Sequence, residues 1–270
     1  MYDCIIIGKG PAGISCAIYL KRFNKNVLVI GKDYGSLGRA KVIENYYGFN
    51  SISGLDLAKK GEEQAENLGI EVITDEVLEI MGLTVITKNN SYEAKSIFLS
   101  TGKANKSNIN IADEALVSYC ATCDGFFYRK KKLALIGNGD FMLHELDVLK
   151  NFTTDITVFS NSEEEIKDSI NGKITKIYEK DGKKCILVNG TDYLFDGIFI
   201  ASSNDSLAIS KHLGLITNDS NKFEVENFKT NIDGIFAGGD AIDGLDQVST
   251  AVSDGAKAAV EINKYLKEEW

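Results

Sequence analysis

The sequence is poor in several residue types and patterns. It contains one proline and two histidines among 270 residues. No apolar run approaches the roughly 20 residues that cross a bilayer, so we expect no membrane-spanning segment. Positive charge is in deficit, because the formal net charge is −9 at pH 7. A surface of that average sign repels phosphate backbones and anionic lipids, which argues against nucleic-acid and membrane partners.

The N-terminus also lacks a basic leader, since a β-branched strand pattern starts at once in residues 3–7. We therefore expect a cytoplasmic protein. In that reducing compartment a close cysteine pair is more often catalytic or metal-binding than structural. Of the five cysteines, Cys4, Cys16 and Cys185 fall within apolar strand or helix patterns. We expect these three to be buried core thiols.

A strand, a glycine turn and a helix are predicted at the start of the chain. Gly8, Gly10 and Gly13 have the spacing G-x-G-x-x-G, which lets the backbone approach a pyrophosphate on the helix N-terminus. Pro11 suits the first helical turn, where its missing N–H would lack an acceptor. The motif predicts dinucleotide binding, and its alternative is a plain tight turn. In such motifs an acidic residue at the end of the next strand binds the ribose. That residue is missing here, and Asp33 lies slightly beyond the expected position.

The same pattern of strand, glycine turn and helix returns in residues 133–150. A strand, a hairpin around Asp181 and Gly182, and the segment GIFIASS follow. GIFIASS occupies in the second half the position that SIFLSTG (residues 96–102) occupies in the first half. We therefore predict two dinucleotide-type α/β units. The remaining segment, with a helix at 247–266, has no place in the second unit and is expected to return to the first.

The segment CATCDG (residues 120–125) contains a C-x-x-C pair. A zinc site would need a second pair of ligands, and neither Cys185 nor His144 and His212 supply one at suitable spacing, so we expect no metal. Close spacing lets Cys120 and Cys123 form a small disulfide ring, and stabilisation of one thiolate speeds exchange with another dithiol. The neighbouring Asp124 is either a proton donor or a solvated turn residue.

A third motif, TNIDGIFAGGD (residues 230–240), is an apolar strand that ends in a glycine pair and a carboxylate. Asp240 can accept hydrogen bonds from hydroxyl groups of a bound ligand, or it can cap the helix that follows. The positive end of that helix would favour a negatively charged ligand group.

With these motifs assembled, the chain resembles the low-molecular-weight thioredoxin reductases along nearly its whole length. The segments that carry the resemblance are GKGPAG, IENY, STG, VSYCATCDGFFYRKKKLALIGNGD, IFAGGD and DQVSTA, in the family's order. The resemblance implies FAD as cofactor, thioredoxin as acceptor and a homodimer. It implies a redox pair in which Cys120 attacks outward and Cys123 lies nearer the flavin, with Asp124 as the acid. The FAD-binding residues that it implies are Gly8, Gly10, Pro11, Ala12, Gly13, Ser36, Asn45, Val77, Thr101, Gly102, Gly239, Asp240, Gln247 and Val248.

The expected fold class is α/β, with two dinucleotide-binding-type (Rossmann-like) domains. The first is discontinuous and binds FAD, with its first part at residues 1–112 and its second part at 203–270. The second is smaller and inserted at residues 113–202. It carries the redox disulfide on a degenerate NADPH-type fold.

The chain departs from the family in that second unit. Gly137 and Gly139 are followed by Phe141 and Met142, although close helix packing needs a small residue there. Beyond the next strand, where the family reads the NADPH phosphate with arginines, the chain has three glutamates, which repel phosphate. The second copy also has a serine at the position that matches Gly102 of the first copy. The three glutamates are Glu163, Glu164 and Glu165, and the serine is Ser203.

An intact flavin site with an eroded nucleotide site is similar to the ferredoxin-dependent flavin thioredoxin reductases. We expect electrons to pass from reduced ferredoxin through FAD and the Cys120/Cys123 disulfide to thioredoxin. An acidic ferredoxin needs a local basic surface on this acidic protein, and residues 129–132 are either that surface or a solvated turn. One alternative is a thioredoxin reductase that uses NADH or NADPH through an atypical site. The other is a flavin redox sensor without turnover.

Overall fold

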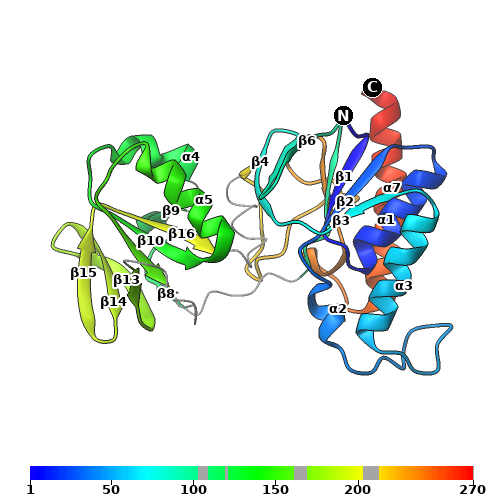
Figure 1. Cartoon of the computed structure of the whole chain (residues 1–270), viewed down its shortest axis with the longest axis horizontal. Helices are drawn as coiled ribbons and strands as arrows, with labels where there is room; N and C mark the ends of the chain where they lie inside the picture. Colours follow the sequence, from blue (N-terminus) through cyan, green and yellow to red (C-terminus); the bar gives the residue numbers. More distant parts are fainter. Residues whose placement is uncertain (103–108, 119–120, 161–168, 203–212, 270) are drawn as a thin grey trace. The chain divides into compact units, whose positions relative to one another are not determined.

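The computed structural model of the chain describes all residues except 103–108, 119–120, 161–168, 203–212 and 270 (Figure 1). The chain divides into two compact units, residues 1–104 with 213–270, and residues 105–212. Each unit contains a parallel sheet with helices, which confirms the predicted α/β class. The second unit begins before the expected residue 113, because β8 (Asn110–Ile111) pairs with β13 (Ile174–Lys180) of that unit.

A five-stranded parallel sheet forms the centre of the first unit, in the order β17-β7-β1-β2-β3. Its inner strands β1 (Cys4–Ile7), β2 (Val27–Ile30) and β7 (Ile97–Leu99) are buried at every residue. Continuous apolar runs of this kind are typical of parallel strands covered on both faces. β3 (Glu71–Ile73) is one edge, and β17 (Ile235–Ala237) pairs with β7 at the other.

Three helices cover one face of this sheet, namely α1 (Pro11–Arg22), α3 (Gly54–Asn67) and α7 (Val248–Glu268) (Figure 1). The α1 and α7 backbones approach closely, since a Cβ on Gly255 would lie 2.1 Å from the carbonyl oxygen of Ala12. The hydrophobic core lies between these helices and the sheet. No helix in the described part of the chain is both long and apolar enough to cross a membrane.

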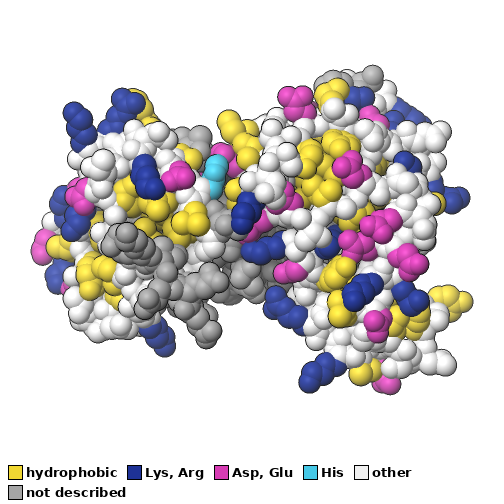
Figure 2. Space-filling view, in the orientation of Figure 1, with side chains coloured by type: hydrophobic (Ala, Val, Ile, Leu, Met, Phe, Trp, Pro, Cys, Tyr) yellow, Lys and Arg dark blue, Asp and Glu magenta, His cyan; other side chains and the backbone are white. Residues whose placement is uncertain are grey.

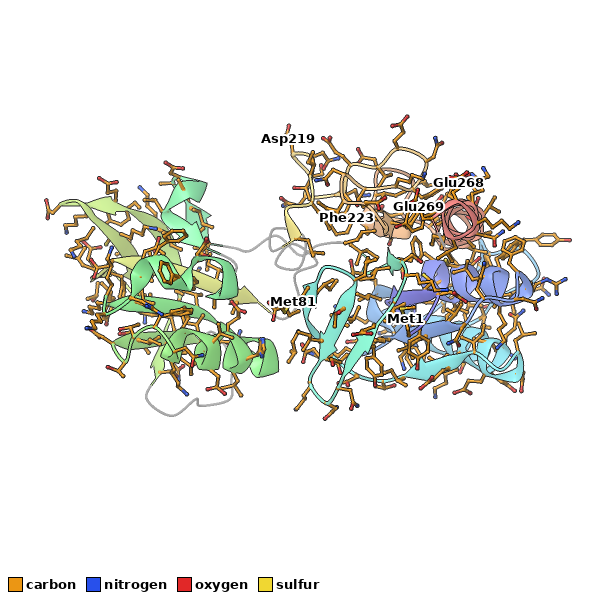
Figure 3. The ribbon with its side chains drawn as sticks, turned by 90° about the horizontal axis from the view of Figure 1, so that it is seen from above. Met1, Met81, Asp219, Phe223, Glu268 and Glu269 are labelled. Atoms are coloured by element: carbon orange, nitrogen blue, oxygen red, sulfur yellow. The ribbon has the colours of Figure 1, made fainter. Side chains whose placement is uncertain are left out.

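The first unit also contains a three-stranded antiparallel sheet of β4 (Val77–Met81), β5 (Thr84–Thr87) and β6 (Ser91–Glu93). In Figure 3, Met81 lies on this sheet, whereas Glu268 and Glu269 lie at the end of α7 on the helical side of the parallel sheet. The short helix α2 (Gly35–Arg39) precedes α3. The parallel sheet therefore has helices on one face and a second sheet on the other (Figure 1).

The second unit repeats the parallel arrangement, with the strand order β12-β11-β10-β16-β9. The expected turn at Asp181 and Gly182 joins two antiparallel strands, and the positive φ angles of both residues, 52° and 71°, suit a tight hairpin. Within the described residues of this unit, the α-helices are α4 (Ala121–Asp124) and α5 (Gly139–Lys150). The further strands described there are β9 (Val117–Ser118), β10 (Leu133–Asn138), β11 (Ile156–Ser160), β12 (Ser169–Asn171), β14 (Lys183–Val188), β15 (Thr191–Phe195) and β16 (Gly197–Ser202).

Candidate functional site

The first glycine loop joins β1 to α1 with its backbone held in place. Gly8 has a φ of +109°, and a Cβ on Gly13 would lie 1.9 Å from the carbonyl oxygen of Gly8. Both positions therefore require glycine. Ser100 Oγ donates to the carbonyl oxygens of Ile7 and Gly8, each at 3.0 Å. A Cβ on Gly10 would meet no atom within 4 Å. Open space thus lies at the N-terminus of α1, where a pyrophosphate fits.

The turn after β7 offers a polar group to a ligand. Thr101 Oγ1 is buried and has no hydrogen-bond partner among the described residues. Gly102 follows with a φ of +75°. A buried hydroxyl without a partner is costly unless a ligand or water supplies one. These residues, at the same sheet edge as the glycine loop, therefore fit a polar part of FAD.

The turn after β17 contacts the start of α1. Gly239 has a φ of +68°, and a Cβ there would lie 2.8 Å from the Cβ of Ala12. Pro11 and Ala12 are the first two residues of α1. Asp240 follows Gly239 in a single 3₁₀ turn, η3 (Gly239–Ala241), and is partly buried. The structure thus brings the Gly-Asp turn to the glycine loop, although the two motifs are far apart in sequence.

Two further predicted residues are in direct contact. Asn45 Nδ2 donates to Gln247 Oε1 at 2.9 Å. Gln247 also caps α7, because its side chain and that of Thr250 exchange hydrogen bonds with each other's backbone. Val248 is the first residue of that helix. Asn45, Gln247 and Val248 therefore come together at one helix N-terminus.

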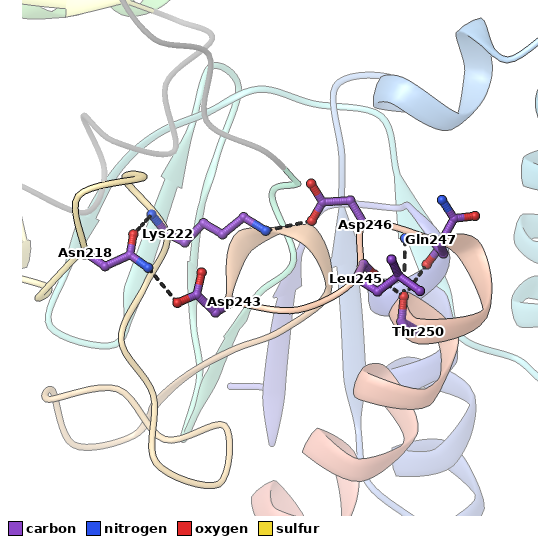
Figure 4. A network of polar contacts seen from close by, with 7 residues as sticks. All are labelled: Asn218, Lys222, Asp243, Leu245, Asp246, Gln247 and Thr250. Atoms are coloured by element: carbon purple, nitrogen blue, oxygen red, sulfur yellow. Dashed lines mark hydrogen bonds and ion pairs between the residues drawn. The ribbon is translucent and has the colours of Figure 1, made fainter.

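The loop that leads to Gln247 is fixed by polar contacts (Figure 4). Lys222 Nζ donates to Asp246 Oδ1 at 2.6 Å, and Asn218 Nδ2 donates to Asp243 Oδ2 at 2.7 Å. Lys222 is buried and Asp246 is partly exposed, so solvent screens this ion pair less than it would screen a fully exposed pair. These contacts hold the residues that precede the α7 N-terminus in one conformation.

Ser36 and Val77 lie on other elements of the first unit. Ser36 is in α2, and Val77 is the first residue of β4, where it pairs with Thr87. Their role in FAD binding stays a prediction.

Lys9 is a residue that the sequence analysis did not single out. Its side chain is only 4% exposed although it is charged. It lies over Gly31, where a Cβ would be 2.6 Å from Lys9 Cγ. The end of β2 therefore has no room for the acid that ordinary dinucleotide sites carry there. The sequence signal is a lysine between the first two glycines together with a glycine at the strand end.

The second glycine loop differs from the first at its third position. Met142 stands where Gly13 stands in the first copy, and it is fully buried. A Cβ on Gly137 would lie 2.9 Å from Met142 Cγ. Ser160 Oγ donates to Asn138 Oδ1 at 2.6 Å, so these side chains join the ends of β10 and β11. The Phe141 side chain, Glu163, Glu164, Glu165 and Ser203 lie outside the described residues.

The turn that carries the predicted redox pair is held by two carboxylates. Ser118 Oγ donates to Asp124 Oδ2 at 2.7 Å. The backbone N–H of Ala121 donates to Oε2 of the buried Glu145 at 2.7 Å, a contact that the sequence analysis missed. The backbone of Cys123 belongs to α4. Its side chain and all of Cys120 lie outside the described residues, so the redox pair stays a prediction.

The other three cysteines, Cys4, Cys16 and Cys185, are buried free thiols, as the sequence predicts. Burial raises the pKa of the Cys4 thiol to about 12 and raises the pKa of Cys16 well above its usual value. Because thiolates are the reactive form, these core thiols are inert at neutral pH. The pair in CATCDG is left as the candidate for thiol chemistry.

Comparison with known proteins places these features in a family. The family described as pyridine nucleotide-disulphide oxidoreductase matches residues 2–255. A thioredoxin reductase of Bacillus subtilis (strain 168) is 31% identical over 306 residues, which cover 99% of this chain and 96% of that protein.

Two solved structures are similar over the whole chain. The atypical thioredoxin reductase TRi from Desulfovibrio vulgaris Hildenborough has a TM-score of 0.88 at 29% identity, covering 100% of this chain and 99% of that one. A ferredoxin-flavin thioredoxin reductase from Clostridium acetobutylicum has a TM-score of 0.80 at 28% identity, covering 99% of each.

Proposed function

Because the chain belongs to the pyridine nucleotide-disulphide oxidoreductase family, we propose that it is a ferredoxin-dependent flavin thioredoxin reductase. The chain is a flavin-dependent, thioredoxin reductase-like disulfide oxidoreductase, and its cofactor is FAD. In the proposal, reduced ferredoxin is the donor and thioredoxin the acceptor. A ferredoxin near −400 mV and a dithiol near −270 mV differ by roughly 130 mV, or about 6 kcal/mol for two electrons. Bound FAD supplies the conversion between single electrons and an electron pair.

The buried side chain of Met142 is the main support for ferredoxin, rather than a nicotinamide nucleotide, as the electron donor. In the first copy, the third glycine position admits no Cβ at all, because helix α1 packs directly onto the loop. In the second copy, a buried methionine fills that position. A side chain of this size beside Gly137 fills space that close approach of a pyrophosphate to the helix N-terminus requires. The Asn138–Ser160 bond further supports loss of the nucleotide site, since it uses polar groups at the strand ends where a nucleotide would bind.

The redox turn fits disulfide exchange. In the proposal, the Cys120 thiolate attacks the thioredoxin disulfide to form a mixed disulfide, and Cys123 resolves it, so that thioredoxin leaves as a dithiol. Asp124 exchanges the proton that this chemistry requires. The Ser118 hydroxyl supports that role, because it holds the Asp124 carboxylate within the turn.

The basic run at residues 129–132 supports ferredoxin docking. All four side chains are exposed, and Arg129 lies 4.7 Å from the ring centroid of the exposed Phe126. Figure 2 shows Lys and Arg side chains on the surface of this unit. Opposite charge steers an acidic partner to such a patch and speeds association. The proposal therefore assigns this run to the donor.

An anaerobic titration of the purified yellow protein tests the proposal. We expect reduced ferredoxin to bleach the flavin absorbance and, with thioredoxin present, to generate free thiols. NADPH and NADH at micromolar concentration should leave the flavin oxidised. Rapid bleaching by either nucleotide would instead establish a nicotinamide-dependent reductase. Flavin reduction by ferredoxin without thiol formation would establish a redox sensor.

A homodimer and a cytoplasmic location complete the proposal. Both are supported by the resemblance to thioredoxin reductases. Light scattering on the purified protein tests the first, and a mass close to the 29.5 kDa of one chain would refute it.

A further inference from the structure

Four polar side chains meet at the ends of β1, β2 and β3, where a dinucleotide-binding fold holds the adenosine. Lys9 lies in the glycine loop, and Tyr34 directly precedes α2. Glu62 lies in α3, and Thr74 directly follows β3. The cluster therefore draws on every element that surrounds this corner of the sheet.

Lys9 is the centre of the cluster. Its Nζ donates to Thr74 Oγ1 at 2.8 Å and to Glu62 Oε1 at 3.2 Å. The ammonium also lies 4.5 Å from the ring centroid of Tyr34. A buried cation is tolerated only with partners of this kind, so Lys9 fixes the position of Glu62.

Both carboxylate oxygens of Glu62 are oriented. Oε1 accepts from Lys9, and Oε2 accepts a short hydrogen bond from the Tyr34 hydroxyl. The hydrogen bond to Glu62, followed by burial, raises the pKa of Tyr34 to about 12, so the phenol stays protonated and donates at neutral pH. Each carboxylate oxygen can accept two hydrogen bonds, and the Glu62 side chain is 16% exposed. Glu62 therefore keeps acceptor capacity that a ligand can reach.

The position at which dinucleotide-binding folds usually carry the ribose-binding acid, the end of β2, has no carboxylate here. Gly31, which directly follows β2, has no side chain, and Lys9 fills the space beside it. Asp33, two residues later, points into its own turn, where its Oδ1 accepts from the backbone N–H of Gly35 at 2.6 Å. Glu62 is thus a carboxylate that the fold presents near the strand ends, together with Glu76, whose Oε1 pairs with Lys32 Nζ at 2.8 Å.

We infer that Glu62, held by Lys9 and Tyr34, accepts the hydrogen bonds of the adenosine ribose of FAD and replaces the acid missing from the end of β2. Lys9 is the positioning residue for this contact. The inference rests on the flavin-binding half of the proposed function and is independent of the electron donor.

The test is a binding cycle on the flavin-depleted full-length protein. Binding of FAD, and of an FAD analogue with 2′,3′-dideoxyribose in its adenosine half, is followed by flavin fluorescence. A hydrogen bond to a charged acceptor corresponds to about a tenfold change in affinity or more. We expect the wild-type protein to prefer FAD over the analogue about tenfold and Glu62→Gln to bind both nearly equally. Lys9→Met should lose the same discrimination.

Two control variants are compared with Glu62→Gln, and in every protein the measured quantity is the ratio of its affinities for FAD and for the analogue. Glu63→Gln, at the exposed neighbouring position of α3, should keep the wild-type preference. Asp33→Asn should also keep it, and loss of the preference there would move the ribose contact to Asp33 and overturn the inference. Because each preference is measured within one variant, altered stability cancels. An unchanged preference in Glu62→Gln also overturns the inference, whereas a wild-type protein that binds no FAD overturns the proposed function itself.

Discussion

The side-chain amide of Asn45 donates to the side chain of Gln247, a residue 202 positions later in the chain. The bond fastens the segment before α3 to the N-terminus of α7. Both residues match FAD-binding positions of the family that the chain resembles. Their contact shows that these positions come together in this fold with the side chains already oriented toward each other.

Removal of this bond should loosen the flavin. Asn45→Ala leaves Gln247 without its partner, and a neutral hydrogen bond contributes on the order of 1 kcal/mol. We expect FAD affinity to fall roughly fivefold in a fluorescence titration. Asn50→Ala, at an exposed position of the same segment, serves as control and should leave affinity unchanged. Equal affinities in both variants would remove Asn45 from the flavin site.

The first glycine loop predicts different outcomes for two alanine variants. Gly13→Ala forces a Cβ against the Gly8 carbonyl, so it should destabilise the flavin-free protein by about 2 kcal/mol or more. Gly10→Ala places its Cβ in open space and should change unfolding by less than about 1 kcal/mol. We expect it nevertheless to weaken FAD binding at least tenfold, because the methyl group enters the pyrophosphate space. Urea unfolding and FAD titration measure the two effects separately.

The cysteines should separate by reactivity. Burial keeps the pKa of Cys4 near 12, far above pH 8, so its thiolate is scarce in the folded protein. At pH 8 we expect iodoacetamide to modify Cys120 and Cys123 after reduction and to modify no cysteine in the oxidised protein. Peptide mass spectrometry reads the sites. Rapid labelling of Cys4, Cys16 or Cys185 in the native protein would contradict the assignment of these residues to the core.

Charge reversal should reveal the donor's docking surface. The double variant Lys130→Glu/Lys131→Glu inverts the middle of the basic run, so reduction by ferredoxin should slow about tenfold at low salt. The remaining rate should also lose most of its salt dependence. Lys173→Glu/Lys176→Glu, a double reversal at exposed positions elsewhere in the same unit, is the matched control. If stopped-flow rates do not differ between the two proteins, the basic run is a solvated turn.

Much of the fold could be predicted because its signals are local. The β-branched run before Gly8 and the positive-φ pair Asp181 and Gly182 each identify an element within a few residues. Because the order of strand, glycine turn and helix occurs twice, the sequence also predicted two α/β units. By contrast, β8 and β9 have two residues each, too few for any periodic pattern.

The candidate site was predictable where a motif sets the backbone and hidden where side chains meet at long range. Gly8 and Gly13 could be identified because the turn itself requires glycine. The contact of Lys9 with Glu62 joins positions 53 apart, and no spacing rule connects them. The contact of Ala121 with Glu145 likewise depends on how α5 packs beside α4.

The pairing of β17 with β7, and of α7 with α1, sets an order on biosynthesis. A ribosome synthesises residues 105–212 before it makes β17, so the second unit has its whole sequence while the first still lacks a strand and a helix. Asp240 and Gln247 emerge later still. In the proposed flavin site, which includes Asp240 and Gln247, cofactor capture waits for the last helix, so we expect nascent chains arrested before residue 235 to retain no flavin.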